Sequence, residues 1–123
     1  MPGTLRRFYE LLDGPRAEQS LAMLAEDLRF SILFSDGPGE AHDFAGGRGE
    51  FDRYMAQRGA PTWTHHVLAE LLDADVEVVF GETRQDGSAV ATFVAAIRLD
   101  ADGRICRYIV GRSPAVLFEL ERA

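Results

Sequence analysis

The sequence contains no lysine, and all 13 of its basic residues are arginines. A lysine Schiff base is therefore excluded, as is a P-loop, whose lysine contacts the bound phosphates. The single cysteine, Cys106, cannot form a disulfide within the chain. The sequence shows no signal-peptide pattern and no run of 18 apolar residues, so we expect a cytoplasmic protein that does not bind membranes.

Positive charge is also scarce relative to negative charge. Acidic residues number 20 against 13 basic ones, which gives a formal net charge of −7 at pH 7. This balance argues against nucleic acid and anionic membranes as partners. A hydrophobic content of 46% over 123 residues is ordinary for a globular protein with its own core. We expect one domain over residues 1–123.

The stretch 61–114 reads as four antiparallel strands joined by three tight turns. The turns are expected at Asp73-Ala74, at Asp86-Gly87 and at Asp100–Gly103. Asp-Gly is a strong signal for a two-residue hairpin. Side chains alternate between the two faces of a strand, so each turn position also determines which residues lie opposite one another.

With two-residue turns at the first two positions, His65 lies opposite Glu82 and Trp63 lies opposite Arg84. The face that carries them is apolar and ends in these four polar or aromatic groups, which is typical of a pocket wall. The predicted cavity face comprises Trp63, His65, Val67, Ala69, Leu71, Val76, Val78, Phe80, Glu82, Arg84, Ala91, Phe93, Ala95 and Ile97.

The opposite face of these strands is too apolar to face only water. Its apolar members, set among threonines, are Leu68, Val79, Val90 and Val94. An apolar surface of this kind usually marks a contact with a partner. We therefore expect a homodimer formed through the outer face of the sheet.

The chain before residue 61 alternates between helical and strand patterns. Spacing of apolar residues and the positions of glycine and proline predict these elements. They are helices over Thr4–Asp13, Arg16–Ala25 and Gly47–Arg58, strands over Asp27–Ser35 and Glu40–Ala45, and a short terminal helix over Val116–Arg122. This order predicts an α+β fold with the helices packed on one face of a mainly antiparallel sheet.

Three stretches carry a resemblance to a known family: RFYELLDGPRAEQSLAMLAEDLRFSI, FAGGRGEFDRYMAQ and AAIRLDADGRICRYIVG. With this order of elements, the chain resembles the SnoaL-like and ketosteroid-isomerase-like branch of the nuclear transport factor two-like superfamily. The resemblance implies a cone-shaped half-barrel, in which three N-terminal helices lie over the concave face of a curved antiparallel sheet. It also implies a pocket for a small apolar or oxygenated ligand, and a dimer through the outer face.

The residues of ketosteroid isomerase chemistry are not matched. The resemblance places Ile32 where the family has its base and Ala95 where it has its protonated acid. Its helix-one position falls near Arg7 or Phe8, with Tyr9 adjacent. Limonene-epoxide-hydrolase-like members need two carboxylates and an arginine, and the predicted cavity face offers one carboxylate. Neither reaction is expected here.

The best candidate for chemistry is His65 opposite Glu82. A carboxylate beside an imidazole selects one tautomer and raises its pKa, which makes a general base near neutral pH. Arg84 is the candidate for binding an anionic group, and Tyr9 for donating a hydrogen bond from the helical side. Clusters of this kind are also common as structural hydrogen-bonded groups, so a structural role for the cluster is the alternative.

The other candidate residues form a ligand-binding wall, and most of them are aromatic or aliphatic. They are Trp63, Phe30, Ile32, Phe34, Tyr54, Phe80, Phe93, Ala95, Tyr108 and Arg112. If Leu99 faces Arg104 across the third turn, Tyr108 points inward opposite Ala95, whereas a bulged turn sends it outward. The family resemblance favours the inward choice, which brings Val110 and Arg112 with it.

No cofactor and no metal are expected. His65 and His66 are neighbours in a strand and point to opposite faces, which makes them a poor metal pair. Two classes of function remain. One is a cofactor-free enzyme of isomerase, cyclase or dehydratase type that acts on an apolar oxygenated metabolite. The other is a non-catalytic ligand-binding or dimeric association domain.

Overall fold

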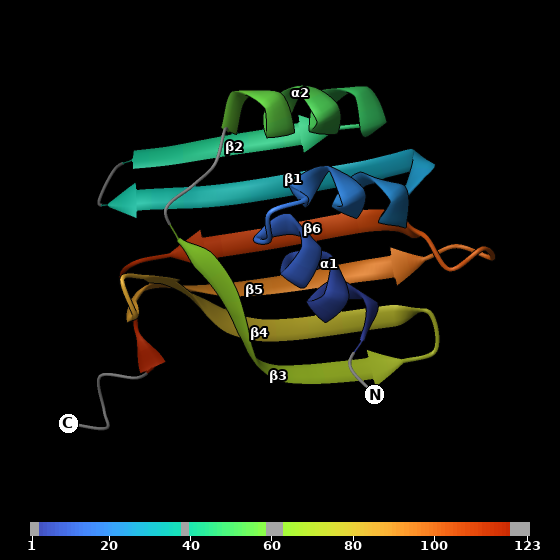
Figure 1. Cartoon of the computed structure of the whole chain (residues 1–123). Helices are drawn as coiled ribbons and strands as arrows, with labels where there is room; N and C mark the ends of the chain where they lie inside the picture. Colours follow the sequence, from blue (N-terminus) through green and yellow to red (C-terminus); the bar gives the residue numbers. More distant parts are fainter. Residues whose placement is uncertain (1–2, 38–39, 59–62, 119–123) are drawn as a thin grey trace.

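The computed structural model describes residues 3–37, 40–58 and 63–118, with only the backbone at 34–37, 40–42 and 58. Helices lie on one side of a six-stranded sheet (Figure 1). The elements are α1 (Thr4–Leu12), the 3₁₀ helix η1 (Ala17–Met23), β1 (Leu24–Gly37), β2 (Glu40–Gly46), α2 (Arg48–Arg58), β3 (Thr64–Asp73), β4 (Val76–Gln85), β5 (Ser88–Leu99) and β6 (Ile105–Ser113).

The strands follow the order β2-β1-β6-β5-β4-β3 across the sheet. Every neighbouring pair is antiparallel except β1 and β6, which run parallel. The predicted α+β fold, with a curved sheet and three helices before the last four strands, is confirmed, and the sheet is mixed rather than wholly antiparallel. No helix in the described residues is long and apolar enough to cross a membrane.

The second helix differs from the predicted one. We expected an α-helix over Arg16–Ala25, but the chain forms a 3₁₀ helix and Ala25 already belongs to β1. The buried Ser20 hydroxyl donates a hydrogen bond to the Ala17 carbonyl at 2.6 Å. Such local side-chain bonds compete with the α-helical pattern and favour short, tight turns. The predicted terminal helix over Val116–Arg122 lies largely outside the described residues.

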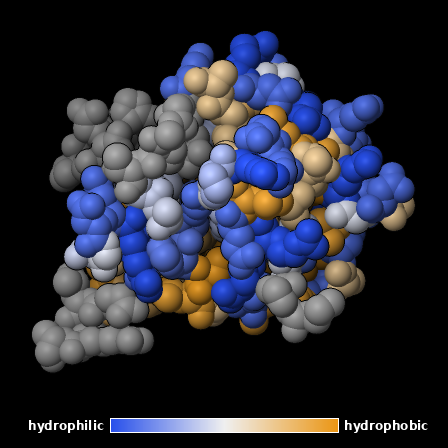
Figure 2. Space-filling model, viewed as in Figure 1, coloured by the Kyte–Doolittle hydropathy of each residue, from blue (hydrophilic) through white to orange (hydrophobic). Residues whose placement is uncertain are grey.

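The core lies between the helices and the concave face of the sheet. Helix α1 buries one stripe, Leu5, Phe8, Tyr9 and Leu12, and these side chains belong to the same cluster as Phe93 of β5 and its neighbours. In Figure 1, α1 lies in front of β4 and β5, and α2 lies over β2. Figure 2 shows the helix side covered largely by hydrophilic residues, so α1 is amphipathic in the usual sense.

Two carboxylates hold the N-terminus of α1 against the sheet. Glu77 of β4 accepts hydrogen bonds from the backbone N–H groups of Thr4 at 3.0 Å and Leu5 at 2.9 Å. Glu70 of β3 accepts from Gly3 N–H at 2.9 Å and from Arg6 at 2.7 Å. The first amides of a helix have no partner within it, and carboxylates at that end are favoured by the helix dipole. These contacts orient α1 over the cavity described below.

The first hairpin turn is one residue later than predicted. Asp73 pairs with Val76, so the turn is Ala74-Asp75 rather than Asp73-Ala74, and Ala74 has a φ of 53°. The register then shifts again between Val67 and Ala69, where β3 has a bulge at Leu68. The predicted Asp86-Gly87 turn is confirmed because Gln85 pairs with Ser88.

The bulges change which face each residue occupies. A second register shift lies between Thr83 and Arg84 in the pairing of β4 with β5, so Gly81 rather than Phe80 pairs with Phe93. The buried residues of β4 are therefore Glu77, Val79, Gly81 and Thr83, together with Glu82 on the other face. The predicted cavity positions Val76, Val78, Phe80, Glu82 and Arg84 belong to the outer face, whereas Val79 belongs to the core.

The bulge in β3 coincides with a sharp bend of that strand. Figure 1 shows β3 bending sharply near its middle, as a bulge makes a strand do. A Cβ at Gly81 would lie 2.3 Å from the His66 carbonyl oxygen and 2.7 Å from the Phe93 ring. Only glycine permits this close approach. The predicted inward set of β5, Ala91, Phe93, Ala95 and Ile97, is confirmed as buried.

The outer face of the sheet keeps exposed apolar residues at its centre. Leu33 is 50% exposed, Val94 54% and Ile109 59%. Leu33 and Val94 both pair with Gly111, and Ile109 lies two residues before it. The chain after β6 passes over a different part of this face, where Thr92 donates a hydrogen bond to the Val116 carbonyl and Phe118 packs on Phe80.

Replacing Glu77 by glutamine should destabilise the fold. The substitution removes a charged acceptor from two helical amides at a buried position, so we expect a loss of about 1–2 kcal/mol in the free energy of unfolding. Denaturant unfolding followed by circular dichroism measures it. Glu10→Gln is the matched control because Glu10 is exposed on the same helix. Equal free energies of unfolding for the two variants would show that the hydrogen bonds from α1 to Glu77 do not stabilise the fold.

Candidate active site

A cavity lies between the concave face of the sheet and helices α1 and α2. It encloses about 20 Å³, which holds about one water molecule, so a larger guest requires its wall to open. Most of its lining is aromatic or aliphatic. The lining residues are Phe8, Leu12, Ile32, Phe51, Tyr54, Met55, Trp63, His65, Phe93, Tyr108, Val110 and Arg112.

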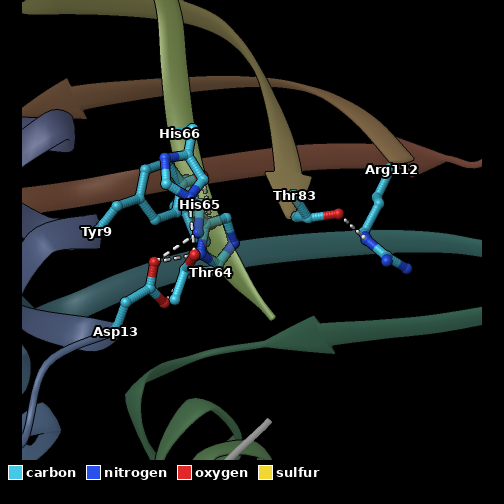
Figure 3. A network of polar contacts seen from close by, with 8 residues as sticks. Tyr9, Asp13, Thr64, His65, His66, Thr83 and Arg112 are labelled. Carbon is cyan, nitrogen blue, oxygen red and sulfur yellow. Dashed lines mark hydrogen bonds and ion pairs between the residues drawn. The ribbon is translucent and has the colours of Figure 1, made fainter. Parts of the chain in front are cut away.

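A polar contact of the site joins Asp13 to His65 (Figure 3). Asp13 caps α1, and its backbone N–H donates to the Tyr9 carbonyl at 2.9 Å. Its Oδ2 accepts the His65 backbone N–H at 2.6 Å, and both carboxylate oxygens lie 3.1 Å from His65 Nδ1. Each side chain is 10% exposed. Because a carboxylate accepts here, a neutral His65 ring carries its proton on Nδ1 and its lone pair on Nε2.

Aromatic rings fix the plane of the His65 imidazole. The Tyr9 ring stacks on it with centroids 4.2 Å apart and planes 10° from parallel. Phe93 meets it edge-on at 5.3 Å and Trp63 edge-on at 5.1 Å. Both the ring plane and the tautomer are therefore set by neighbours. This arrangement is what a proton-transferring histidine requires, since its reactive nitrogen must keep one direction.

The hydroxyl groups of Tyr9 and Tyr108 lie 2.9 Å apart in the core. Burial, and next the nearby Tyr108 hydroxyl, hold the pKa of Tyr9 well above its ordinary value. Tyr9 therefore stays a neutral phenol at physiological pH and acts as a hydrogen-bond partner, not as a base. Tyr108 lines the cavity. The inward orientation of Tyr108 is confirmed, although it pairs with Ile97 rather than with Ala95.

Arg112 stands at the side of the cavity where β6 ends. Its Nε donates to the hydroxyl of the fully buried Thr83 at 3.2 Å, as Figure 3 shows. Its Cζ lies 4.7 Å from the centroid of the Trp63 ring. The hydrogen bond and the cation–π contact together hold the guanidinium group in one place.

The predicted meeting of His65 and Glu82 is wrong. His65 pairs with Thr83, and Glu82 pairs with His66. Glu82 forms an ion pair with Arg84, and neither residue lines the cavity. The later turn and the bulge in β3, with the second shift between β4 and β5, moved Glu82 to the outer face. His65 keeps its predicted inward position and uses a different carboxylate.

The predicted ligand-binding residues divide into four groups. Six line the cavity: Ile32, Tyr54, Trp63, Phe93, Tyr108 and Arg112. Phe30 and Ala95 are buried in the core behind it. Phe80 lies on the outer face against Phe118, so its predicted place is wrong. The side chain of Phe34 lies outside the described part of the structure.

Asp13 is the residue that sequence reasoning missed. It lies 52 positions from His65, and no periodicity connects the two. One weak signal was present. A carboxylate at the C-terminal end of a helix is unfavourable for the helix dipole unless a donor or a cation compensates it. Such an acid invites a search for a partner, but the sequence does not name His65 as that partner.

Solved structures with this fold bear out the family resemblance at the level of fold. A proposed isomerase of the SnoaL-like family from Agrobacterium tumefaciens is 15% identical, covers 89% of this chain and 95% of that chain, and has a TM-score of 0.67. A proposed polyketide cyclase from Sinorhizobium meliloti is 23% identical, with coverage of 89% and 94% and a TM-score of 0.58. A proposed ketosteroid isomerase from Kribbella flavida is also 23% identical, with coverage of 92% and 77% and a TM-score of 0.62.

These neighbours define the class of fold. The chain has the architecture shared by SnoaL-like, ketosteroid-isomerase-like and nuclear transport factor two-like proteins. No protein-family model matches the chain, and no curated protein matches it either. The identities are low, so the activity has to be argued from the site itself.

The Asp13–His65 contact predicts a definite histidine tautomer. In the intact protein at a pH where the ring is neutral, His65 should carry its proton on Nδ1, and Asp13→Ala should abolish this preference. Two-dimensional ¹⁵N–¹H spectra of the histidine rings distinguish the two tautomers. His66 supplies a control in the same spectra because its ring contacts Thr64 and not Asp13. An Nε2-protonated His65 in the unmodified protein would contradict the assignment.

Proposed function

We propose that the cavity binds a small apolar, oxygenated metabolite and that His65 moves a proton between two positions of it. The observation that carries this proposal is the Asp13–His65 dyad set into an otherwise apolar wall. An imidazole with an orienting carboxylate is a common general base, and an apolar surround strengthens its effect on a bound substrate. No cofactor is needed for this chemistry.

The proposed proton transfer uses His65 as the base and Tyr108 as the hydrogen-bond donor. His65 Nε2 takes a proton from a carbon next to a carbonyl group, and the C–H electron pair moves toward the carbonyl oxygen. Tyr108 donates a hydrogen bond to the developing oxyanion while Tyr9 donates to Tyr108. The imidazolium, held by Asp13, then returns the same proton to another carbon of the substrate. Atoms and charge balance, and the net reaction is an isomerisation.

The fold neighbours support this type of reaction without assigning it. Two of them are proposed isomerases and one is a proposed polyketide cyclase. This chain lacks the base and the acid that the ketosteroid isomerase pattern would place at Ile32 and Ala95. His65 and Asp13 would therefore perform the same chemistry from different elements.

A second candidate is a non-catalytic ligand-binding or association domain. The small size of the cavity, about 20 Å³, favours it because the protein's own side chains fill most of the space between sheet and helices. The two candidates differ in the role of His65. In an enzyme it transfers a proton, whereas in a binding domain its contact with Asp13 serves to dock the end of α1 on β3.

Isomerisation of a β,γ-unsaturated ketone such as cyclohex-3-enone tests the catalytic proposal. The conjugated product absorbs in the ultraviolet, so the rate is read directly. We expect the protein to accelerate the reaction and His65→Ala to lower the rate by about 10²–10⁴-fold, the usual contribution of general base catalysis. His66→Ala should retain the rate, because His66 lies on the other face of the same strand.

The result separates the two candidates when binding is measured in parallel. Trp63 is the single tryptophan and lines the cavity, so its fluorescence reports occupancy. Saturable binding with no turnover would reject the catalytic role and favour the binding domain. Turnover that survives His65→Ala would reject the role of His65. Thermal unfolding of each variant shows whether the fold is retained.

We also propose that a second copy of the chain covers the outer face of the sheet. The exposed side chains Leu33, Val94 and Ile109 surround Gly111, where a Cβ would meet no atom within 4 Å. Because Gly111 has no side chain, the surface of a second copy can approach the sheet closely between these apolar residues. Val79, which the sequence pattern assigned to this face, is buried in the core and takes no part.

Sedimentation tests the dimer. At tens of micromolar, where interfaces of standard size hold, we expect a dimer for the unmodified chain and a monomer for Val94→Glu. Leu72→Glu is the matched control, because Leu72 is 52% exposed but pairs with Glu77 of the concave face. A monomeric parent chain, or a dimer that tolerates Val94→Glu, would contradict the proposal.

A further inference from the structure

The cavity is far smaller than a site for an organic ligand. It encloses about 20 Å³, whereas pockets that hold small organic molecules usually enclose about 300 Å³ or more. A ligand can therefore enter only if one of the lining side chains leaves its place. The identity of that side chain determines which molecules the cavity admits.

Most of the large lining side chains are fixed by burial within regular elements. Phe8 of α1, Phe51 of α2 and Phe93 of β5 are fully buried. Tyr54 is half-buried on α2, and its ring packs on Phe44 with centroids 4.9 Å apart and on Phe51 at 5.9 Å. Moving any of these rings would expose apolar area to water or shift a helix or strand. We therefore expect them to keep their places.

Trp63 is the large lining residue that differs from these. Its side chain is half-buried, and it precedes β3, which begins at Thr64. A residue at the end of a strand moves at a lower free-energy cost than a residue inside the hydrogen-bonded ladder. Tryptophan also has the largest of the lining side chains, so its departure vacates the most space.

Arg112 of β6 holds the Trp63 ring in place. Arg112 pairs with Phe93 of β5, and its side chain reaches across β5 to β4, where Nε donates to the hydroxyl of the fully buried Thr83 at 3.2 Å. Its Cζ lies 4.7 Å from the centroid of the Trp63 ring. Every further contact of the guanidinium group fixes it more firmly. A cation–π contact of this kind favours one position of the indole and is still weak enough to break.

We propose that Trp63 is a plug that occupies the ligand space of the empty protein, and that Arg112 is the latch that holds it there. When a ligand enters, the indole ring turns toward the solvent and the ligand takes its place beside His65, whose ring meets Trp63 edge-on at 5.1 Å. The ligand is therefore an apolar ring compound no larger than an indole. The proposal rests on the cavity being the ligand site of the proposed function, and it adds the size of the ligand and the step that admits it.

Cyclohexanol, a small uncharged ring compound, tests the latch by isothermal titration calorimetry. Ligand binding competes with the contact between Arg112 and Trp63, so weakening this contact should favour the open state. We expect Arg112→Met, which keeps the length of the side chain, to lower the dissociation constant of cyclohexanol about two- to fivefold, the equivalent of one exposed cation–π contact. An arginine that binds the ligand would give the opposite result.

Trp63→Leu tests the plug. We expect this variant to bind cyclohexanol at least about tenfold more tightly than the unmodified protein, because an apolar space that is already vacant binds a guest without displacing a side chain. Adding Arg112→Met to Trp63→Leu should then change the dissociation constant less than about twofold, since the contact is already absent. Any other contact of Arg112 is lost in both backgrounds, so its effect cancels in this comparison.

The fluorescence of Trp63 supplies a second readout because the chain has no other tryptophan. Saturation of the unmodified protein with cyclohexanol should move the emission to longer wavelength as the indole ring enters water. Arg107→Met is the matched control, because Arg107 is exposed on the same strand and carries the same charge. It should leave both the affinity and the emission unchanged. Thermal unfolding of each variant shows that it is folded.

The outcomes distinguish this inference from the proposed function. Unchanged or weaker binding in Arg112→Met overturns the latch, and an emission that stays constant or moves to shorter wavelength at saturation overturns the plug. Failure of folded Trp63→Leu to bind cyclohexanol at millimolar concentration overturns the inference together with the cavity as a ligand site. Tighter binding in both variants without isomerisation of cyclohex-3-enone rejects only the catalytic role of His65.

Discussion

The contact between Asp13 and His65 determines the geometry of the whole site. A single carboxylate binds both the backbone and the ring of His65, so it joins the end of α1 to the beginning of β3. The other end of α1 is held by Glu77, which satisfies its first amides. Helix α1 is therefore anchored at both ends over the concave face of the sheet. Tyr9 of α1 stacks on the imidazole ring of His65, which Asp13 orients.

The charged groups around α1 and the cavity occupy distinct places. Carboxylates lie where they satisfy amides or hold a histidine, and the cavity wall retains Arg112 and His65 as its ionisable cationic groups in the described lining. Burial keeps Tyr9 protonated, so the hydroxyl pair with Tyr108 supplies hydrogen bonds rather than charge. His65, Tyr108 and Arg112 therefore line one largely apolar space.

Much of the fold could be predicted because its signals are local. The Asp86-Gly87 turn has a specific chemistry, and the alternation of Ala91, Phe93, Ala95 and Ile97 has one period in one strand. The register between strands is less local. One bulge at Leu68 and one shift next to Arg84 moved Glu82 from the predicted cavity to the outer face. A bulge depends on how the sheet bends over its helices, and no residue pattern within one strand records that bend.

The sequence by itself indicated several residues of the site, but it did not determine which of their side chains contact one another. The alternation of residues before the first turn predicted that Trp63 and His65 share the concave face, whereas the inward position of Arg112 was left open by the third turn and was favoured by the family resemblance. Only the tertiary structure decided that the carboxylate beside His65 is Asp13. The physical reason is that a helix and a strand separated by 52 positions meet through packing of the core, which sums contributions from the entire chain. Local patterns determine which side of an element faces inward, and the packing determines which residues meet there.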